Sequence, residues 1–112
     1  MKFSKKSRLL TRFDFRRVSH KGKTAYGEHL IIDYYFGKAT SPKLGLTISR
    51  RAGKAHVRNR FKRVVREAFR HISHELPPNL EMNIRPKFNN FDINSLEAAL
   101  EIKQLLRSHI AP

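Results

Sequence analysis

The strongest constraint on how this chain can fold is an amphipathic helical pattern over residues 55–74. Apolar side chains recur there at steps of three and four residues, the spacing of one helical face at about 100° per residue. This apolar set is Val57, Phe61, Val64, Val65, Ala68, Phe69 and Ile72. Polar and basic side chains take the other face and its flanks: Arg58, Asn59, Arg60, Lys62, Arg63, Arg66 and Arg70. The pattern predicts a helix that buries one face and presents a row of cations on the other.

The charges on this predicted helix are almost all of one sign. Residues 50–70 hold nine Lys and Arg and a single acid, Glu67. Lys62 and Arg66 are a like pair four residues apart, and so are Arg66 and Arg70. A solvated helix face normally mixes signs, because opposite pairs contribute about 0.2–0.5 kcal/mol each and like pairs cost similar amounts. The uniform sign favours binding to phosphate groups, for which Arg offers a planar fork of donors.

The charge of the whole chain points the same way. Its 112 residues carry 24 Lys and Arg against 9 Asp and Glu, a net charge of +15. Residues 1–70 hold 20 of these cations and 4 acids, whereas residues 71–112 hold 4 cations and 5 acids. Self-repulsion on this scale destabilises a compact state, so a polyanionic partner is the natural explanation.

Composition also excludes several classes of protein. Cysteine is absent, which rules out disulfides, cysteine zinc sites, iron–sulfur clusters and thiol nucleophiles, and which suits a reducing cytoplasm. No apolar run approaches the roughly 20 residues that span a bilayer, and the N-terminus lacks the apolar stretch of a signal peptide. We expect a cytoplasmic protein with a flexible basic arm over residues 1–7 and a single domain over residues 8–112.

Local patterns predict the other elements. A helix over residues 9–19, with Leu9, Phe13 and Val18 on its apolar side, ends at Gly22. Three segments alternate or are rich in β-branched and aromatic residues and are predicted strands: 29–36, 43–49 and 80–85. The first two strands are expected to form a hairpin, because turn-forming residues separate them. Alternation turns Leu44, Leu46 and Ile48 inward.

A last helix is predicted over residues 95–109. Asn94 followed by Glu97 resembles a capping box at its start. Its inner side is expected to carry Leu96, Leu100 and Leu106. The order helix, strand, strand, helix, strand, helix predicts an α+β fold, a single-domain two-layer sandwich of one sheet and packed helices.

The kind of nucleic acid is constrained by these elements. A helix-turn-helix DNA reader needs a second short helix coupled to the basic one, and the strands on either side argue against it. Binding to phosphates needs no base readout. Aromatic side chains near the cations are candidates for stacking on single strands, although each of them is also a natural core residue. These are Phe13, Phe15, Tyr26, Tyr34 and Tyr35.

Two consecutive stretches resemble the signature of a known family. Residues 44–55 read Leu-Gly-Leu-Thr-Ile-Ser-Arg-Arg-Ala-Gly-Lys-Ala, and residues 57–63 read Val-Arg-Asn-Arg-Phe-Lys-Arg. Together with Arg66 to Arg70 they resemble the bacterial ribonuclease P protein subunit. The N-terminal pattern from Arg8-Leu9 to Gly22 is similar to that family as well, so the resemblance covers nearly the whole chain.

The resemblance implies a fold and a function. The fold is α+β with a small mixed sheet and an unusual left-handed βαβ crossover, which the general handedness rule does not predict. The function is that of a protein subunit of an endoribonuclease whose RNA, with bound Mg²⁺, removes the 5′ leader of precursor tRNA. The implied partners are that catalytic RNA and precursor tRNA, without DNA or membrane. No protein catalytic residue, cofactor or metal ligand is assigned.

The resemblance also implies two groups of site residues. Those expected to contact the catalytic RNA are Arg50, Arg51, Lys54, Arg58, Asn59, Arg60, Lys62, Arg63, Arg66 and Arg70. Those expected in a cleft for the single-stranded leader are Arg12, Phe15, Arg16, Ser19 and Tyr34. Phe15 matches an aromatic of the family's cleft. Ser19 and Asp33 stand where the family has further cleft aromatics, and Tyr34 is adjacent to the second.

Three other functions compete with this one. A small basic protein of ribosomal type would bind folded RNA without supporting cleavage. A stand-alone nuclease would need an acid–base pair or a metal cluster, for which His71 and His74, with Glu75 nearby, are the only spaced candidates. An amphipathic helix over residues 8–20 could lie on a membrane surface, but the basic region extends far beyond it.

Overall fold

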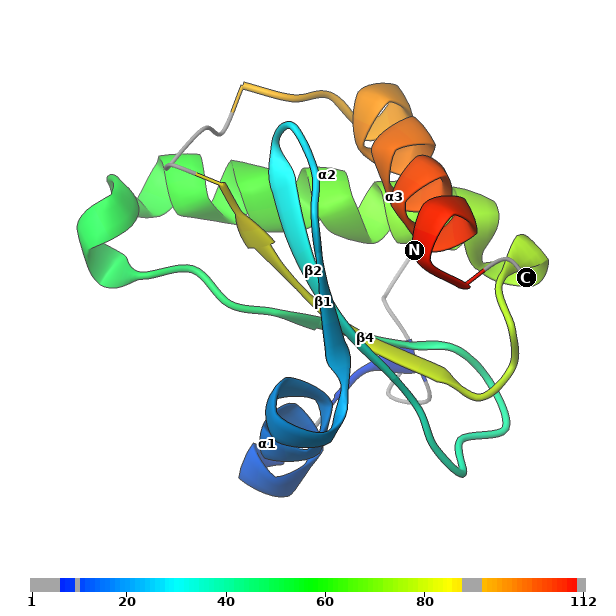
Figure 1. The fold of residues 1–112 in the computed structure, drawn as a ribbon. Coiled ribbons are helices and arrows are strands. Elements are labelled where there is room, and N and C mark those ends of the chain that lie inside the picture. Colours follow the sequence, from blue (N-terminus) through cyan, green and yellow to red (C-terminus); the bar gives the residue numbers. More distant parts are fainter. Residues whose placement is uncertain (1–6, 10, 88–91, 111–112) are drawn as a thin grey trace.

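A four-stranded mixed sheet runs through the middle of the molecule, with helices on both of its faces (Figure 1). The structure is a computed structural model that describes residues 7–9, 11–87 and 92–110. All but the last residue of the predicted flexible arm, 1–7, lies outside the described residues. The elements follow in the order α1 (Arg12–Lys21), β1 (Lys23–Tyr26), β2 (Leu30–Phe36), β3 (Lys43–Leu46), η2 (Arg50–Ala52), α2 (Ala55–Ile72), η3 (Ser73–Glu75), β4 (Leu80–Pro86) and α3 (Ser95–Ile110).

The sheet packs its apolar face against α2 and α3, which form the helical layer of the predicted sandwich. Alternation along β2 and β4 sends every second side chain into this core, among them Ile32, Met82 and Ile84, all fully buried. Phe61 and Phe69 of α2 fill the same core. The other face of the sheet is crossed by α1, which packs on β2 and β4 (Figure 1). The prediction of a single α+β domain is therefore confirmed. The predicted two layers are wrong, because α1 covers the second face of the sheet and adds a third layer.

The predicted hairpin between the strands at 29–36 and 43–49 is wrong. The strand order is β1-β2-β4-β3, so β4 lies between β2 and β3. The hairpin that forms joins β2 to β1, a four-residue strand that was not predicted and that pairs antiparallel with it. Short strands such as Lys23–Tyr26 carry little alternation of their own, and the pairing of β3 depends on a partner far away in the sequence.

Strands β3 and β4 are parallel and joined through α2, which makes a βαβ unit. This unit explains why the longest described helix lies between β3 and β4 in the sequence: a parallel pair needs a crossover connection, and α2 provides it across one face of the sheet. The left-handed sense implied by the family resemblance stays a prediction.

Helix α1 begins later than predicted, at Arg12 rather than at residue 9. Thr11 and Asp14 form a reciprocal capping box that fixes this start, with distances of 3.0 and 3.1 Å. Leu9 belongs instead to an extended segment whose amide donates to the carbonyl of Leu44. The predicted end at Gly22 is confirmed, since its amide donates to the carbonyl of Val18.

The inner side of α3 also differs from the prediction. Leu96 and Leu100 are 71% and 52% exposed, whereas Ala98, Ile102 and Leu106 are buried. Leu106 is therefore confirmed as an inner residue, and the rest of the buried face, which packs on α2, is formed by Ala98, Ala99 and Ile102. The predicted capping box is confirmed: Asn94 and Glu97 exchange hydrogen bonds of 2.8 and 3.2 Å.

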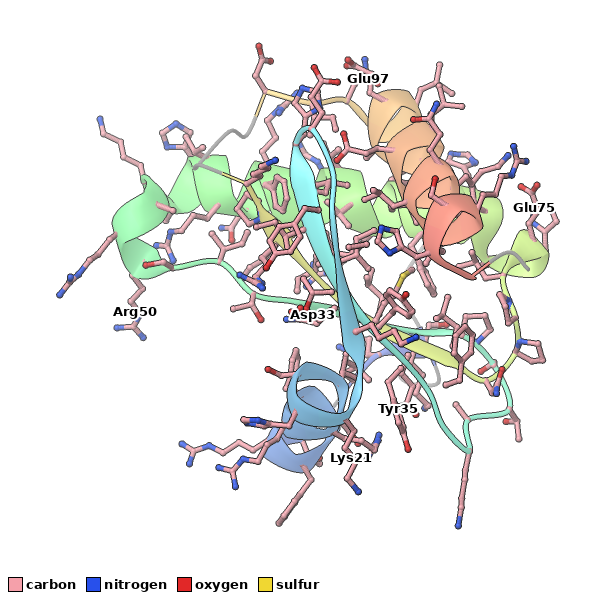
Figure 2. All side chains as sticks on the ribbon, viewed as in Figure 1. Lys21, Asp33, Tyr35, Arg50, Glu75 and Glu97 are labelled. Atoms are coloured by element: carbon pink, nitrogen blue, oxygen red, sulfur yellow. The ribbon has the colours of Figure 1, made fainter. Side chains whose placement is uncertain are left out.

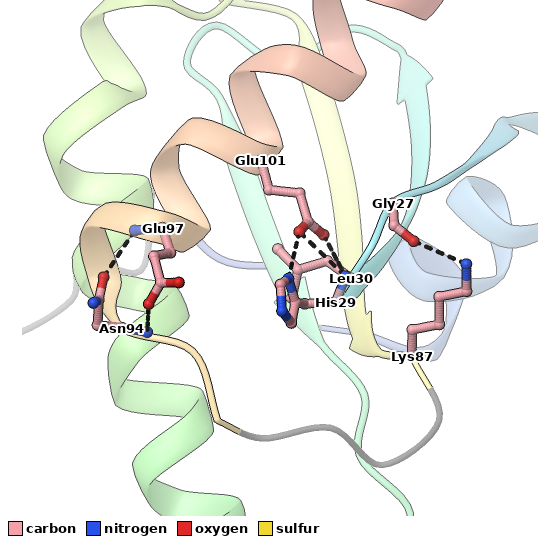
Figure 3. A network of polar contacts seen from close by, with 7 residues as sticks. All are labelled: Gly27, His29, Leu30, Lys87, Asn94, Glu97 and Glu101. Atoms are coloured by element: carbon pink, nitrogen blue, oxygen red, sulfur yellow. Dashed lines mark hydrogen bonds and ion pairs between the residues drawn. The ribbon is translucent and has the colours of Figure 1, made fainter.

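A polar clamp ties α3 to the turn of the β1–β2 hairpin (Figure 3). The carboxylate of Glu101 accepts the backbone amides of His29 and Leu30 and lies 2.9 Å from Nδ1 of His29. On the other side of the turn, Nζ of Lys87 donates to the carbonyl of Gly27 at 2.9 Å. A long-range contact between residues some seventy positions apart thus holds the hairpin turn in place.

Candidate nucleic-acid interface

The basic surface starts in the loop that leads into α2. The Ser49 hydroxyl accepts the amide of Arg51 at 3.2 Å and so starts the η2 turn. Lys54, three residues after Arg51, directly precedes α2, and the first turn of this helix contains no acidic residue. Nε of Arg58 donates to the carbonyl of Gly53 at 3.2 Å and ties the loop to the helix. Arg50, which Figure 2 labels, therefore projects from a loop anchored at both ends.

The predicted faces of α2 are confirmed. Phe61, Val64, Val65, Ala68, Phe69 and Ile72 are its buried residues. The predicted interface residues are exposed or half-buried and lie on the rest of its surface: Arg58, Asn59, Arg60, Lys62, Arg63, Arg66 and Arg70. Because α2 has 18 residues, this surface extends over about 27 Å at a rise of about 1.5 Å per residue.

The protein leaves much of this positive charge without a counter-charge. Over residues 7–9, 11–87 and 92–110, no ion pair involves Lys62, Arg63 or Arg66. Glu67 is the only acid in α2, and it too is exposed. The positive end of the α2 dipole adds to the cations at the start of the helix. The arrangement suits a chain of phosphates that supplies the missing negative charge.

Helix α1 contributes a second group of cations with different surroundings. Arg17 forms ion pairs with Asp14, at 3.0 Å, and with the buried Glu81 of β4. The hydrogen bond to Glu81 raises the pKa of Arg17 above its ordinary value. Arg12 and Arg16 are exposed. Arg17 therefore fastens α1 to the sheet, whereas Arg12 and Arg16 are available at the surface.

Three of the predicted leader-cleft residues lie in one stripe along α1. At about 100° per residue, Arg12, Phe15 and Ser19 fall within about 60° of one another. Phe15 is half-buried against β3, and a Cβ on Gly45 would come within 2.5 Å of its ring. Glycine at this position lets the aromatic ring lie on the strand. The stripe thus faces the strand that continues into the basic loop at Arg50.

Tyr34 is not brought together with these residues. It is 4% exposed and belongs to the core between the sheet and the helices α2 and α3. Its neighbour in sequence, Asp33, points to the α1 face instead, because side chains alternate along β2. The structure therefore separates the predicted cleft residues of α1 from Tyr34 by the thickness of the sheet.

The α1 face of the sheet carries a polar network that was not predicted. Asp33 accepts the Thr24 hydroxyl at 2.7 Å and the guanidinium of Arg85 at 3.3 and 3.4 Å. Asn83, next along β4, accepts the Thr47 hydroxyl at 3.1 Å. Arg85 is the cation that sequence reasoning missed. The inward alternation of Leu80, Met82 and Ile84 was the signal that could have placed it on this face.

The histidines do not build a metal site within the described residues, where no group of three His, Asp or Glu side chains could hold an ion. The predicted candidates remain exposed, with His74 Nε2 3.9 Å from Glu75. Within the same residues, no helix has the length and apolar character needed to cross a membrane.

Comparison with known proteins decides the family. A family model described as Ribonuclease P matches residues 3–109. The chain belongs to the ribonuclease P protein family. It is thus a protein subunit of ribonuclease P, an endoribonuclease of tRNA processing in which protein and RNA assemble. The resemblance drawn from residues 44–70 is confirmed.

Individual ribonuclease P proteins agree with this assignment. The ribonuclease P protein component of Desulforapulum autotrophicum is 32% identical over 105 residues, which cover 94% of this chain and 90% of that protein. The component of Chlamydia pneumoniae is 41% identical over 86 residues, which cover 74% of this chain. That second match spans 60% of the length of the Chlamydia pneumoniae protein.

Solved ribonuclease P proteins share the fold described above. The protein from Thermotoga maritima superimposes with a TM-score of 0.79 at 26% identity, covering 90% of this chain and 96% of that one. The protein from Staphylococcus aureus gives a TM-score of 0.77 at 24% identity, covering 93% and 95%. The arrangement of three helices around a four-stranded mixed sheet is therefore that of the ribonuclease P protein fold.

Proposed function

We propose that this subunit binds the catalytic RNA of ribonuclease P along the basic face of α2 and the adjoining loop. The contacting residues are Arg50, Arg51, Lys54, Arg58, Asn59, Arg60, Lys62, Arg63, Arg66 and Arg70. The observation that carries the proposal is the lack of ion pairs, among the described residues, at the central cations Lys62, Arg63 and Arg66. Guanidinium groups held apart from acids are free to bind phosphates in pairs of hydrogen bonds.

The proposal includes a second contact, to the 5′ leader of precursor tRNA, on the side of α1 that faces β3. Phe15 offers a ring on which an unpaired base can stack, with Arg12 and Arg16 beside it for the phosphates. Ser19 adds a hydroxyl to the same stripe. The leader would run from this stripe along β3 toward Arg50, so one strand could connect the two basic surfaces.

In this proposal the protein performs no bond-breaking step. Mg²⁺ bound to the RNA supplies the chemistry, and the cations of the protein screen the repulsion between the catalytic RNA and the precursor. The effect is to hold the leader in place while the RNA cleaves the phosphodiester that joins it to the mature 5′ end. We place this activity in the cytoplasm, which suits a chain without cysteine.

Reconstitution with the catalytic RNA tests the proposal. At low Mg²⁺ concentration, addition of the protein is expected to restore cleavage of precursor tRNA, and more strongly for a substrate with a 5′ leader than for one with a single leader nucleotide. A small basic ribosomal protein serves as the control and should not restore cleavage. Equal stimulation by both proteins would support the ribosomal-type alternative, and equal stimulation of both substrates would contradict the leader contact.

A further inference from the structure

A depression of about 370 Å³ opens at the end of the sheet where α1, β1, β2 and α3 meet. The end of α1 supplies Lys21 and the start of β1 supplies Lys23. The end of β2 supplies Tyr34 and Phe36, and the last turn of α3 supplies His109. Lys21 and Tyr35, both labelled in Figure 2, also line the depression. The core-side alternation of β2 keeps Tyr34 and Phe36 apart from the Phe15 stripe on the other face.

Tyr34 is the unusual member of this lining. It is among the buried core residues, yet its hydroxyl has no hydrogen-bond partner among the described residues. Among the described residues, the Nε atom of Arg8 is the only buried side-chain polar atom without a partner, so the Tyr34 hydroxyl is not sealed in the core. It opens into the depression, where a ligand can reach it. The ring of Tyr34 meets Phe36 edge-on at 6.2 Å and His109 edge-on at 6.3 Å. Both of those rings are exposed, so the hydroxyl is accompanied by two accessible π surfaces.

The rim of the depression carries positive charge. Lys21 and Lys23 are exposed and form no ion pair with the described residues. No carboxylate lines the depression. Gly22 lies between the two lysines, and a Cβ there would come within 2.1 Å of the Tyr34 carbonyl oxygen. This close approach holds the backbone between the two lysines against β2, so both lysines start beside the aromatic residues of the depression.

We propose that this depression binds one unpaired nucleotide of an RNA strand. The base of this nucleotide lies against the rings of Phe36 and His109, and its phosphate lies near Lys21 and Lys23. The Tyr34 hydroxyl donates a hydrogen bond to the nucleotide. The volume is at the small end of ligand pockets, which suits a mononucleotide unit. Aromatic rings beside cations are the combination that holds unpaired bases. The choice of an RNA strand rests on the proposed function, since a free nucleotide has the same chemistry.

The test is a titration of the full-length, isotope-labelled protein followed by nuclear magnetic resonance. The probes are adenosine 5′-monophosphate, inorganic phosphate and a single-stranded RNA pentanucleotide. Adenosine 5′-monophosphate is expected to shift the ring resonances of Phe36 and His109, and phosphate alone should leave these rings unmoved. The pentanucleotide is expected to bind at least tenfold more tightly than the mononucleotide.

Two pairs of variants make the test specific. Tyr34→Phe removes only the hydroxyl and is expected to weaken binding of the mononucleotide about twofold to tenfold, the effect of one hydrogen bond. Tyr26→Phe is its control, because Tyr26 is 64% exposed and lies outside the depression. Lys23→Gln should weaken binding more than Lys38→Gln, which removes an exposed lysine from the loop after β2.

Several results would overturn the proposal. These are unmoved rings with the mononucleotide, equal binding of phosphate and mononucleotide, or no difference between Tyr34→Phe and Tyr26→Phe. If the mononucleotide bound as tightly as the pentanucleotide, the ligand of this site would be a free nucleotide and not an RNA strand. Restoration of cleavage by the wild-type protein is measured separately. A failed titration with restored cleavage therefore contradicts this site alone, and lost cleavage contradicts the proposed function.

Discussion

At the scale of single residues, neighbours decide what an arginine does. Arg17 is held between Asp14 and Glu81, so its charge is used to attach α1 to the sheet. Arg63 and Arg66 have the same side chain but form no ion pair with the described residues. Exposed arginines that remain unpaired contribute little to folding, so their cost in like-charge repulsion is best explained by a partner.

Replacing Arg66 by alanine is expected to lower the affinity for the catalytic RNA and to flatten its dependence on salt. Each lost phosphate contact reduces the slope of log K against log salt by about 0.9 on duplex and about 0.7 on single strands. Arg63→Ala should have the same effect. Arg107→Ala is the matched control, because it also removes one exposed arginine but from α3, outside the proposed interface. Filter binding over a range of KCl concentrations measures the slope, and an unchanged slope for Arg66→Ala would argue against a phosphate contact.

Phe61 tests the buried face of the same helix. Its side chain is fully buried between α2 and the sheet. Phe61→Ala is expected to reduce the free energy of unfolding by about 3–5 kcal/mol, because it removes a large apolar group and leaves a cavity. Phe13→Ala is the control, since Phe13 is 77% exposed and its loss should change stability by less than about 0.5 kcal/mol. Urea unfolding distinguishes the two, and equal midpoints would contradict the assigned orientation of α2.

At the scale of elements, two kinds of contact position the helices. Helix α1 is attached to the sheet through Arg17 and through the close approach of Phe15 to Gly45. Helix α3 is attached to the β1–β2 hairpin through the carboxylate of Glu101, which accepts two backbone amides and the imidazole of His29. Charge-assisted hydrogen bonds of this kind are stronger than neutral ones, so the clamp helps to orient α3 on the sheet.

The clamp makes stability depend on pH. The hydrogen bond to Glu101 raises the pKa of His29 above its ordinary value of 6.5, and the nearby Glu28 and Glu97 act in the same direction. A raised folded-state pKa contributes stability that is fully present below the unfolded-state pKa and is lost as pH rises through the folded-state pKa. The His29→Gln substitution should therefore lower the free energy of unfolding more at acidic pH than at alkaline pH.

Urea unfolding at about pH 5.5 and about pH 8.5 checks this difference, because the lower value lies below the ordinary pKa of 6.5 and the upper value lies well above it. His56→Gln is the control, because His56 is exposed at the start of α2 and outside the clamp. The same pH dependence in both variants would show that the His29–Glu101 contact is not responsible.

At the scale of the whole molecule, charge opposes folding. The net charge of +15 is concentrated in residues 1–70, which include α1, the basic loop and most of α2. These elements lie on different sides of one small sheet, so their mutual repulsion acts across the entire domain (Figure 1). A bound polyanion relieves this repulsion and stabilises the native state by mass action.

Sulfate is therefore expected to stabilise the isolated protein more than chloride does at equal ionic strength. Both salts screen charge, but only a multivalent anion bridges neighbouring cations on the folded surface. Thermal unfolding followed by circular dichroism measures the difference in Tm. Arg63→Ala combined with Arg66→Ala should reduce the sulfate effect, and identical Tm values in the two salts would contradict anion binding by the folded state.

What the sequence by itself determined is the helix α2 with its two faces, the strand before it and the family signature that they contain. These features depend on the periodicity of consecutive residues, which is present before any distant contact forms. The same holds for both capping boxes, although only that of α3 was predicted.

Only the tertiary structure decided which strands are neighbours and which face each side chain joins. The pairing of β2 with β1 and β4, the burial of Tyr34 away from Phe15, and the exposure of Leu96 and Leu100 all follow from long-range packing. The attachment of Glu101 to His29 across 72 positions has no local signal at all. Alternation shows that a strand has two faces, but the partners that cover those faces come from elsewhere in the chain, which is why these features required the folded molecule.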